Sequence, residues 1–462
     1  MNCTYMKQTI KNKIALSLML LFGLFSQAQS KKWTLAECVD YAIKNNISIK
    51  QSDLDSQSAV IGKKDAVGNF LPTINANASH SWNVGLNQNI TTGLLENQTT
   101  QFTSAGLNSS IAIYNGLQNV NRLRRANMAI VAAQYQLTKM KDDVSLNVAN
   151  AFLQILFNKE NIKVQKEQLA TNEKQLARSQ ELVDAGVIAR GDLLDIKATI
   201  ASNTQAIVNA ENALLISKLS LAQLLQLDNF QDFDIVEDDY EAKQSETMLQ
   251  TPSAIYEKAK EVRVELKIAR ANMELAQRDV QIARGAYQPS VSGFYSFSTR
   301  ASDSDRILFD SMGNPSISGP LPLFDQFSNN KGHNFGVQLN IPILNGFSVR
   351  NNVARSKIAL DRSKIALSQQ ELDLERNVYT AFTDAKGAMK AYESALVALE
   401  ARQEAYNYAK EKFDVGLMNA FDFNQSQSLL VNAQSEVLRT KFDYIFRIKV
   451  LEFYFGIPIN QK

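Results

Sequence analysis

The 462-residue chain has little cysteine, little proline, two histidines and a single long apolar run. Its two cysteines are Cys3 and Cys38, and Cys3 lies in an N-terminal segment that we expect to be removed, so the mature chain cannot form an internal disulfide. We expect Cys38 to be a buried helix thiol. Neither His80 nor His333 accompanies a paired carboxylate or a cysteine pattern, and the sequence contains no phosphate loop or nucleophile motif. These absences predict no cofactor, no metal site and no enzymatic activity.

The one long apolar run lies at the N-terminus. Three lysines precede an apolar stretch at residues 14–25, and small residues follow it. This pattern is typical of a secretory signal peptide, so we expect residues 1–28 to be cleaved after Ala28. No later run reaches the 18 apolar residues that a spanning helix needs, so an exported protein of this kind would enter a membrane as a β-barrel.

The chain also lacks an excess of charge of either sign. It has 49 Lys and Arg against 47 Asp and Glu, and removal of the three lysines in the signal peptide leaves 46 against 47. A nearly neutral chain gives no support for a nucleic-acid partner. One irregular stretch, at 228–250, is rich in acidic residues, and we interpret it as a solvated linker.

What the chain contains instead is an internal duplication. Asn115-Gly116 recurs 230 positions later as Asn345-Gly346, and upstream an offset of 217 relates Gly68 to Gly285. An offset that holds over long stretches indicates a repeated structural unit. We therefore predict two structural repeats, at 29–227 and 251–462, joined by an acidic equatorial linker at 228–250. Each repeat would contain a helix, two strands, a long helix and a return helix.

Each repeat has two segments in which apolar and polar residues alternate. In the first repeat, Ile74, Trp82 and Val84 share one parity and Asn75 and Asn83 the other. Period two predicts strands with one apolar and one polar face. The polar face is short and uncharged, which favours a wet lumen opposite a lipid-facing band over a soluble sandwich. We predict that the connections at 86–100 and 301–333 are loops.

Two 67-residue segments, Gln118–Asp184 and Ser348–Asp414, contain no proline and almost no glycine. Each would form a helix of roughly 100 Å with coiled-coil spacing of its apolar residues. Each is predicted to end at a glycine turn, from which a return helix starts at Asp192 or Asp422. Further helices are expected at 34–68 and 253–285, without internal breaks.

Four strands in one chain cannot close a membrane barrel, because eight is about the minimum. Three copies would supply twelve strands, and symmetric closed rings are the usual solution for such contacts. We therefore predict a homotrimer with a 12-stranded membrane β-barrel in outer-membrane lipid. A long α-helical barrel, a tunnel twelve helices wide, would continue it.

The order of these features resembles the outer-membrane factor family, the TolC-like channel-tunnels of Gram-negative bacteria. The resemblance covers nearly the whole mature chain, from Thr34-Leu35 and Leu71-Pro72 to Val415-Gly416-Leu417 at the second turn. It implies an exit duct for efflux or type I secretion that lies in the cell outer membrane and extends into the periplasm. The implied partners are a periplasmic adaptor, that is a membrane fusion protein, and an inner-membrane transporter of RND or ABC type. The alternative is a secreted coiled-coil structural or adhesin protein.

The resemblance also implies a pore gate near the glycine turns. In well-known members, acidic rings lie six and nine residues after the turn glycine, and Asp192, Asp195 and Asp422 match these positions. A simpler interpretation makes Asp192 and Asp422 helix N-caps.

The second turn departs from the family pattern. In well-known members a Tyr three residues before the glycine and an Arg two after it hold the closed tip. Phe413 and Met418 stand at these positions, and Gln425 replaces the outer acidic residue, so this turn has no Arg lock. The adaptor is expected to contact both turns, at Ala185, Gly186, Val187, Val415, Gly416 and Leu417.

Overall fold

A computed structural model describes residues 32–459, apart from 89–92, 187–188, 238–241 and 243–244. The predicted signal peptide therefore lies outside the described residues. The chain divides into two compact units. We call them the sheet unit, residues 54–135 and 267–368, and the hairpin unit, which holds the described residues among 1–53, 136–266 and 369–462.

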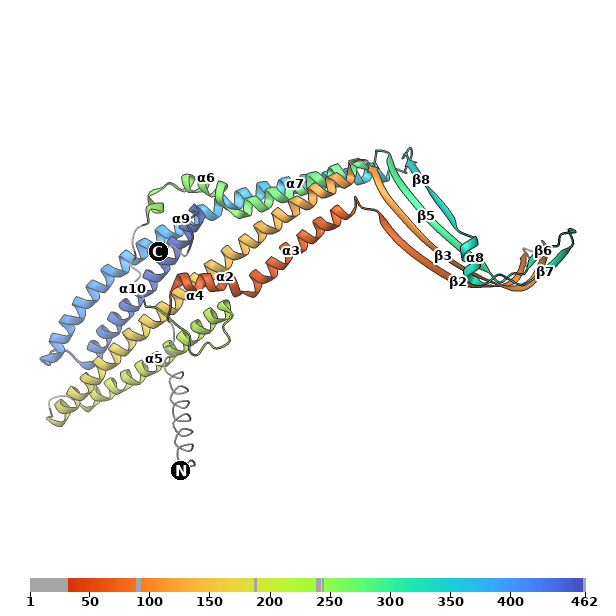
Figure 1. The fold of residues 1–462 in the computed structure, drawn as a ribbon. Helices are drawn as coiled ribbons and strands as arrows, with labels where there is room; N and C mark the ends of the chain where they lie inside the picture. The colour runs from red at the N-terminus through yellow and green to blue at the C-terminus, as the bar shows by residue number, and fades with distance from the viewer. Residues whose placement is uncertain (1–31, 89–92, 187–188, 238–241, 243–244, 460–462) are drawn as a thin grey trace, which may run out of the picture. The chain divides into compact units, whose positions relative to one another are not determined.

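The sheet unit contains one antiparallel sheet of four long strands in the order β2-β3-β5-β8 (Figure 1). The strands are β2 (Thr73–Gln88), β3 (Leu95–Asn115), β5 (Ser290–Ser302) and β8 (Gly332–Asn340). The two strands of each repeat are therefore neighbours, and the repeats meet where β3 pairs with β5. β2 and β8 form the two edges.

The helices occur in pairs of equal length, one from each repeat. They are α2 (Leu35–Asn45) and α6 (Pro252–Val262), α3 (Ile47–Gly68) and α7 (Val264–Gly285), α4 (Gln118–Asp184) and α9 (Ser348–Asp414), and α5 (Arg190–Leu225) and α10 (Ala420–Phe455). The predicted bounds of the two long helices are confirmed, and the return helices begin two residues earlier than predicted. Among the described residues, no helix is both long enough and apolar enough to span a membrane.

The prediction of unbroken helices at 34–68 and 253–285 is wrong. Asn46 ends α2 with a non-helical ψ of 132°, donates its side-chain amide to the Leu224 carbonyl oxygen, and accepts from the Ser48 amide at 2.9 Å. Arg263 separates α6 from α7 with a ψ of 128°. At the first break the Asn46 side chain thus supplies a capping bond that the backbone lacks.

The prediction of loops at 86–100 and 301–333 is wrong in part. β2 and β3 stay paired out to Gln88 and Leu95, so the backbone ladder continues into the segment that we expected to be a loop. The second connection contains structure of its own: β6 (Arg306–Phe309) pairs with β7 (Pro315–Ser318), and α8 (Leu323–Asn329) follows.

The core of the hairpin unit gathers around α2, α4 and α5. Phe152, Leu221 and Cys38 are fully buried there, and burial raises the pKa of the Cys38 thiol to about 12, so the expected buried thiol is confirmed. Thr34 and Glu37 form a capping box that begins α2.

The linker between the repeats is anchored rather than merely solvated. β1 (Lys32–Trp33) pairs with β4 (Asp234–Ile235), and a single 3₁₀ turn follows at Glu246–Leu249. Lys159, which is 9% exposed, contacts Asp234 at 2.7 Å and Glu237 at 3.0 Å. Burial would raise the pKa of Asp234, but hydrogen bonds from two lysines outweigh it and lower the pKa. The prediction of a solvated linker is therefore wrong for this part.

Candidate pore and gate site

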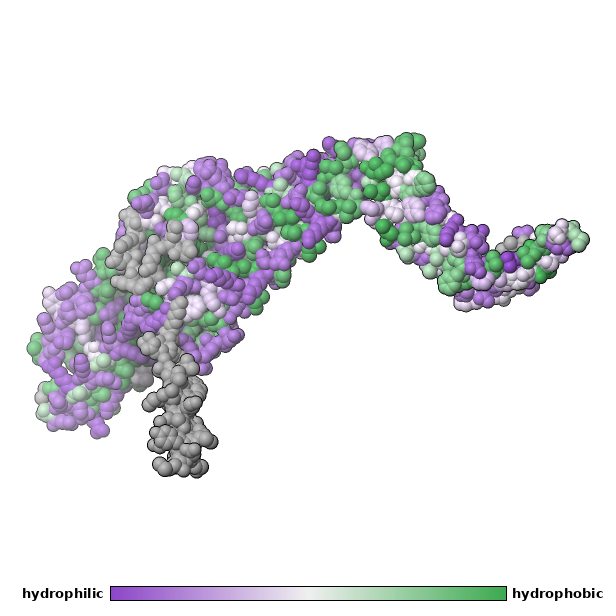
Figure 2. Space-filling model, viewed as in Figure 1, coloured by the Kyte–Doolittle hydropathy of each residue, from purple (hydrophilic) through white to green (hydrophobic). Residues whose placement is uncertain are grey.

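One face of the sheet is apolar and exposed across all four strands. The strand register places Leu107 opposite Phe297, and Phe297 opposite His333. On the edge strands Trp82 is 61% exposed and Phe335 is 77% exposed. Figure 2 shows hydrophobic side chains gathered where the strands meet the helices. The strand register places the apolar residues of neighbouring strands on the same face, as the alternation predicted. They therefore form one continuous band.

The opposite face of the sheet is polar and has few charges. Asn108 donates its side-chain amide to Asn77 Oδ1 at 3.1 Å and accepts from Ser296 Oγ at 2.7 Å, which links three strands. Two aromatic residues of the described strands share this face, Phe102 and Phe294. The ring of Phe294 packs over Gly336, where a Cβ would lie 3.0 Å from Cζ. A face of amides and hydroxyls is readily hydrated, as the predicted wet lumen requires.

Both histidines make side-chain contacts within the sheet. His80 Nδ1 lies 2.8 Å from Thr103 Oγ1, and His333 Nδ1 lies 2.9 Å from the Tyr295 hydroxyl. His333 belongs to β8, so its predicted place in a loop is wrong. In the described part of the chain, no three His, Cys, Asp or Glu side chains are grouped as metal ligands would be.

The first hairpin turn joins α4 to α5. Ala185 and Gly186 are exposed, and Gly186 takes a φ of +74°, which favours glycine. Val187, the third predicted contact residue of this turn, lies outside the described residues. Ala189 occupies the N-cap of α5 and makes no side-chain hydrogen bond there.

The second hairpin turn joins α9 to α10 and is capped. Gly416 takes a φ of +76°, and Val415 and Leu417 are 70% and 79% exposed. Asn419 is the N-cap of α10: its Oδ1 accepts from the Asp422 amide at 2.8 Å, and its Nδ2 donates to the Asp422 carboxylate at 3.0 Å.

The interpretation of Asp192 and Asp422 as N-caps is therefore wrong. Both helices begin two residues earlier than predicted, so each aspartate is the third residue of its helix. There a carboxylate interacts favourably with the helix dipole. Asp192 is partly buried, whereas Asp195 and Asp422 are exposed. No ion pair between described residues involves any of the three.

An ion pair that sequence reasoning missed connects the two hairpins. Arg178 of α4 contacts the carboxylate of Asp414, the last residue of α9, at 2.7 Å, and donates to its carbonyl oxygen at 3.4 Å. Lys410 lies 3.5 Å from the other carboxylate oxygen. The arginine and the aspartate are 236 residues apart, so no local pattern predicts their contact.

Aromatic side chains hold the second turn together. The rings of Phe413 and Phe423 stack with centroids 4.7 Å apart, and Tyr406 lies 5.7 Å from Phe423. Burial, and then the nearby Asp414 carboxylate, raise the pKa of Tyr406 above its ordinary value of 10.0. Phe413 stands at the tyrosine position of the expected gate and serves packing.

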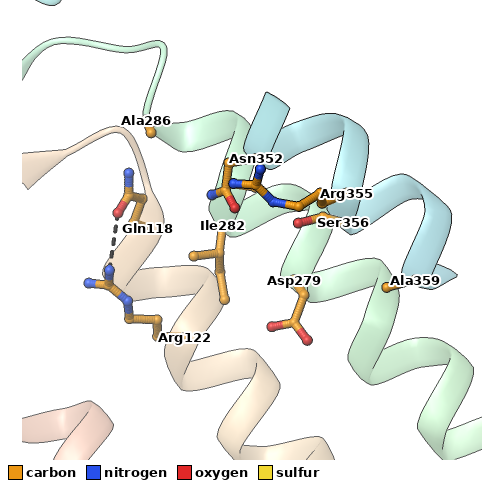
Figure 3. A pocket seen from close by; sticks show the side chains of 10 residues that line it. Gln118, Arg122, Asp279, Ile282, Ala286, Asn352, Arg355, Ser356 and Ala359 are labelled. Carbon is orange, nitrogen blue, oxygen red and sulfur yellow. Dashed lines mark hydrogen bonds between the residues drawn. The ribbon is translucent and has the colours of Figure 1, made fainter. Parts of the chain in front are cut away.

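A groove of about 500 Å³ lies in the sheet unit, between α4, α7 and α9 (Figure 3). Arg122 and Arg355 line it from the two long helices, and Arg122 hydrogen-bonds to Gln118. Asp279 is the one carboxylate among its described lining residues, and it is ion-paired with Arg125 at 2.6 Å.

Comparison with known proteins agrees with this arrangement. The family model described as "Outer membrane efflux protein" matches residues 39–226 and 255–445, more than half of the chain. "Outer membrane protein TolC" of Vibrio cholerae is 22% identical over 439 residues, covering 92% of this chain and 91% of the relative.

Two further comparisons extend the likeness. "Cation efflux system protein CusC" of Escherichia coli strain K12 is 25% identical and covers 79% of this chain and 72% of its own length. The solved structure of the outer membrane protein VceC from Vibrio cholerae superposes with a TM-score of 0.74 at 14% identity, covering 92% of this chain and 96% of that one.

Proposed function

Because the chain belongs to the outer membrane efflux protein family, we propose that it forms the exit duct of an export system, working with a periplasmic adaptor and an inner-membrane transporter. Members of this family are outer membrane channels that extend into the periplasm and are not enzymes. Because the chain belongs to this family, the alternative of a secreted coiled-coil structural or adhesin protein is dropped. The observation that carries the proposal is the sheet, which has an exposed apolar band on one face and a hydrated face on the other.

The duct is a homotrimer. Among the described strands, β2 and β8 each pair with a strand of this sheet on one side only, and four strands cannot close a barrel alone. Apolar side chains seven residues apart stay exposed on α3, at Leu54 (62%) and Ile61 (58%), and on α9, at Ile358 (56%) and Ile365 (70%). Heptad spacing of this kind needs a partner helix, and neighbouring copies supply it.

The adaptor docks at the helix turns. Val415, Leu417 and Phe421 are all more than two-thirds exposed on the second turn, and exposed apolar patches of this kind are typical of protein contacts. Phe421 was not among the predicted contact residues. The first turn contributes Ala185 and Gly186 to the docking surface, and Val187 stays a predicted contact residue.

Leu417→Glu should abolish copurification of the adaptor without changing conductance, whereas Tyr408→Glu, at an exposed position on α9, should leave copurification intact. Adaptor binding that survives Leu417→Glu would exclude this turn as the docking site.

The gate is a ring of carboxylates at the turns. Three chains bring three copies each of Asp192, Asp195 and Asp422 to one narrow opening, and the focused field of these charges favours entry of a cation. The ion pair between Arg178 and Asp414 ties the two hairpins of each chain near that opening.

Planar-bilayer recordings of purified protein test the duct and the gate separately. The wild type should form cation-preferring channels, and Asp192→Asn/Asp195→Asn/Asp422→Asn should lose most of that preference. Glu404→Gln, an exposed carboxylate further along α9, is the matched control and should change nothing. Absence of channels would overturn the duct, whereas channels with unchanged selectivity in the triple variant would overturn only the ring.

A further inference from the structure

We infer that the groove between α4, α7 and α9 binds the phosphate group of an acidic phospholipid. The inference rests on the proposed duct, in which the sheet lies in the outer membrane, and it adds a lipid partner that the duct itself does not require. The groove lies entirely within the sheet unit, so the binding site needs no contact between the two units.

The starts of the two long helices that border the groove are strongly basic. The first eight residues of α4 and the first eight of α9 contain no carboxylate. They contain five arginines, Arg122, Arg124, Arg125, Arg350 and Arg355, of which all but Arg125 are exposed. The whole chain is nearly balanced, with 49 basic and 47 acidic residues, so this positive charge is local. A concentration of charge of one sign attracts a ligand of the opposite sign.

Among the described residues, only one of these arginines has a carboxylate partner. Arg125 contacts Asp279 at 2.6 Å. Arg122 instead donates to Asn119 Oδ1 at 3.0 Å and to Gln118 Oε1 at 3.1 Å, which are neutral amide oxygens. A guanidinium has five N–H donors, so Arg122 retains donors for a phosphate oxygen, and its charge is not cancelled.

Arg355 is the second arginine that lines the groove. Its side chain extends from α9 toward α4, beside Asn352 (Figure 3), and it forms no ion pair with a described residue. The groove has a volume of about 500 Å³, which lies within the range of roughly 300–1,000 Å³ that is typical of small-ligand sites. Planar guanidinium groups match the geometry of phosphate oxygens, and basic pockets between helices at a membrane surface bind the phosphates of lipid head groups.

The groove lies next to the sheet. Gln118 comes three residues after the end of β3, and Ala286 comes four residues before the start of β5. The groove runs from Asn352 to Ala359 along α9, a length of roughly 10 Å at 1.5 Å per residue. The head-group region on each side of a bilayer is roughly 5–8 Å thick, because the full thickness is about 40–45 Å and the apolar core about 30 Å. With the strands in the apolar core, the groove begins at the depth of the head groups in the periplasmic leaflet.

Exposed apolar side chains adjoin the groove on its sheet side. Leu117 precedes Gln118 and is 50% exposed, Tyr287 follows Ala286 and is 52% exposed, and Phe347 precedes α9 and is 62% exposed. Leu117 and Phe347 take φ values of +62° and +65°, which are uncommon for bulky side chains and occur here at equivalent positions of the two repeats. An amphiphile fits this arrangement, with its acyl chains beside these residues and its phosphate beside the arginines.

A neighbouring copy of the chain would not cover the groove. β5 lies between β3 and β8 of the same sheet, and α7 leads into β5, whereas α4 follows β3 and α9 follows β8. The helices on both sides of α7 therefore belong to the same chain. A ring of copies leaves the groove open to a ligand.

Native mass spectrometry of the purified, delipidated protein tests the site. The wild type should retain phosphatidylglycerol about tenfold more than phosphatidylcholine, whose head group carries no net charge. Arg122→Gln/Arg355→Gln should lose this preference. Arg402→Gln/Lys412→Gln is the matched control, because it removes two exposed charges from the far end of α9, and it should keep the preference. Equal retention of the two lipids by the wild type, or a preference that survives in Arg122→Gln/Arg355→Gln, would overturn the site.

An excess of inorganic phosphate separates a lipid site from a site for free anions. Phosphate should displace little phosphatidylglycerol from the wild type, because the apolar side chains beside the groove hold the acyl chains. Displacement of most of the lipid would overturn the lipid assignment. Planar-bilayer recordings of the same samples test the duct separately, and both the wild type and Arg122→Gln/Arg355→Gln should form channels. A wild type that forms no channels would overturn the duct, whereas channels from a protein without lipid preference would overturn only this site.

Discussion

The two hairpin turns have the same length and the same left-handed glycine conformation, but different side chains stabilise them. Their glycines take φ values of +74° and +76°, and each return helix has 36 residues. The second turn has the aromatic cluster of Tyr406, Phe413 and Phe423, together with an asparagine cap.

At the equivalent places the first turn has aliphatic side chains and an alanine cap. The aliphatic residues are Leu176, Val183 and Leu193. The comparison teaches that the duplication preserved lengths and turn geometry while the local stability of the two copies diverged. We expect the first turn to open more readily than the second.

The largest effect should come from the buried centre of each turn. Phe423 is 2% exposed and Leu193 is 5% exposed, so Phe423→Ala should cost about 3–5 kcal/mol of local stability and Leu193→Ala about 2–4 kcal/mol. Hydrogen exchange of peptides covering 405–430 and 175–200 measures both losses. A larger loss at the first turn than at the second would reverse the comparison.

Exchanging the caps should nearly equalise the helix starts. Asn419→Ala removes the acceptor for the Asp422 amide and should cost about 1 kcal/mol, whereas Ala189→Asn should stabilise α5 by up to about 1 kcal/mol. Amide exchange in the first turn of each helix reports the change. If Ala189→Asn brought no added protection, the difference between the turns would lie in packing alone.

Breaking the ion pair between the hairpins should have a smaller effect. Both partners of the Arg178 and Asp414 pair are partly exposed, so Arg178→Gln should cost about 0.2–1 kcal/mol at low salt and less at high salt. Comparing exchange at both turns at two ionic strengths checks this. Arg376→Gln, in an exposed pair within α9, is the control and should leave the turns unchanged. A salt-independent loss would exclude the electrostatic explanation.

The smallest effect should appear only in alkali. Because the folded pKa of Tyr406 is raised, the unfolded turn ionises first as the pH rises, so the contribution of Tyr406 is complete below the unfolded pKa and declines through the folded pKa. Hydrogen exchange corrected for intrinsic rates should therefore show the second turn loosening above about pH 10. Tyr406→Phe should abolish this dependence, and the first turn, with leucine there, should show none. The same pH dependence in both turns would argue against Tyr406 as the cause.

Features whose ends are marked by residues close in the sequence could be predicted. The proline-free segments between each Asn-Gly and the following glycine turn predicted the first and last residues of both long helices. The alternation of apolar and polar residues predicted the two faces of the sheet. The breaks at Asn46 and Arg263 escaped prediction because neither residue is a helix breaker. Asn46 needs the Leu224 carbonyl oxygen, and the Arg263 guanidinium needs Glu265 and the Phe453 ring, at 3.7 Å.

The positions of the two hairpin turns were predictable, but the contacts within them were not. The turns could be located because each follows a long proline-free segment and contains a glycine, and the role of the three aspartates stays a prediction. The pair of Arg178 and Asp414 could not be predicted, because it joins helices from different repeats. The assignment of the aspartates as N-caps was wrong because each helix begins two residues earlier than predicted. Only the backbone geometry shows where a helix begins.

The equal lengths of α4 and α9 carry a consequence for how the chain can change. One residue inserted into either helix would rotate every side chain beyond it by about 100° and turn its heptads away from their neighbours. The connection between β5 and β8 accounts for the growth of the offset from 217 to 230, a gain of 13 residues, while the nine residue pairs of β5 and β8 keep the counterparts that the offsets give them in β2 and β3. The strand connection therefore absorbs this difference in length, and the paired helices of the two repeats differ by substitution alone.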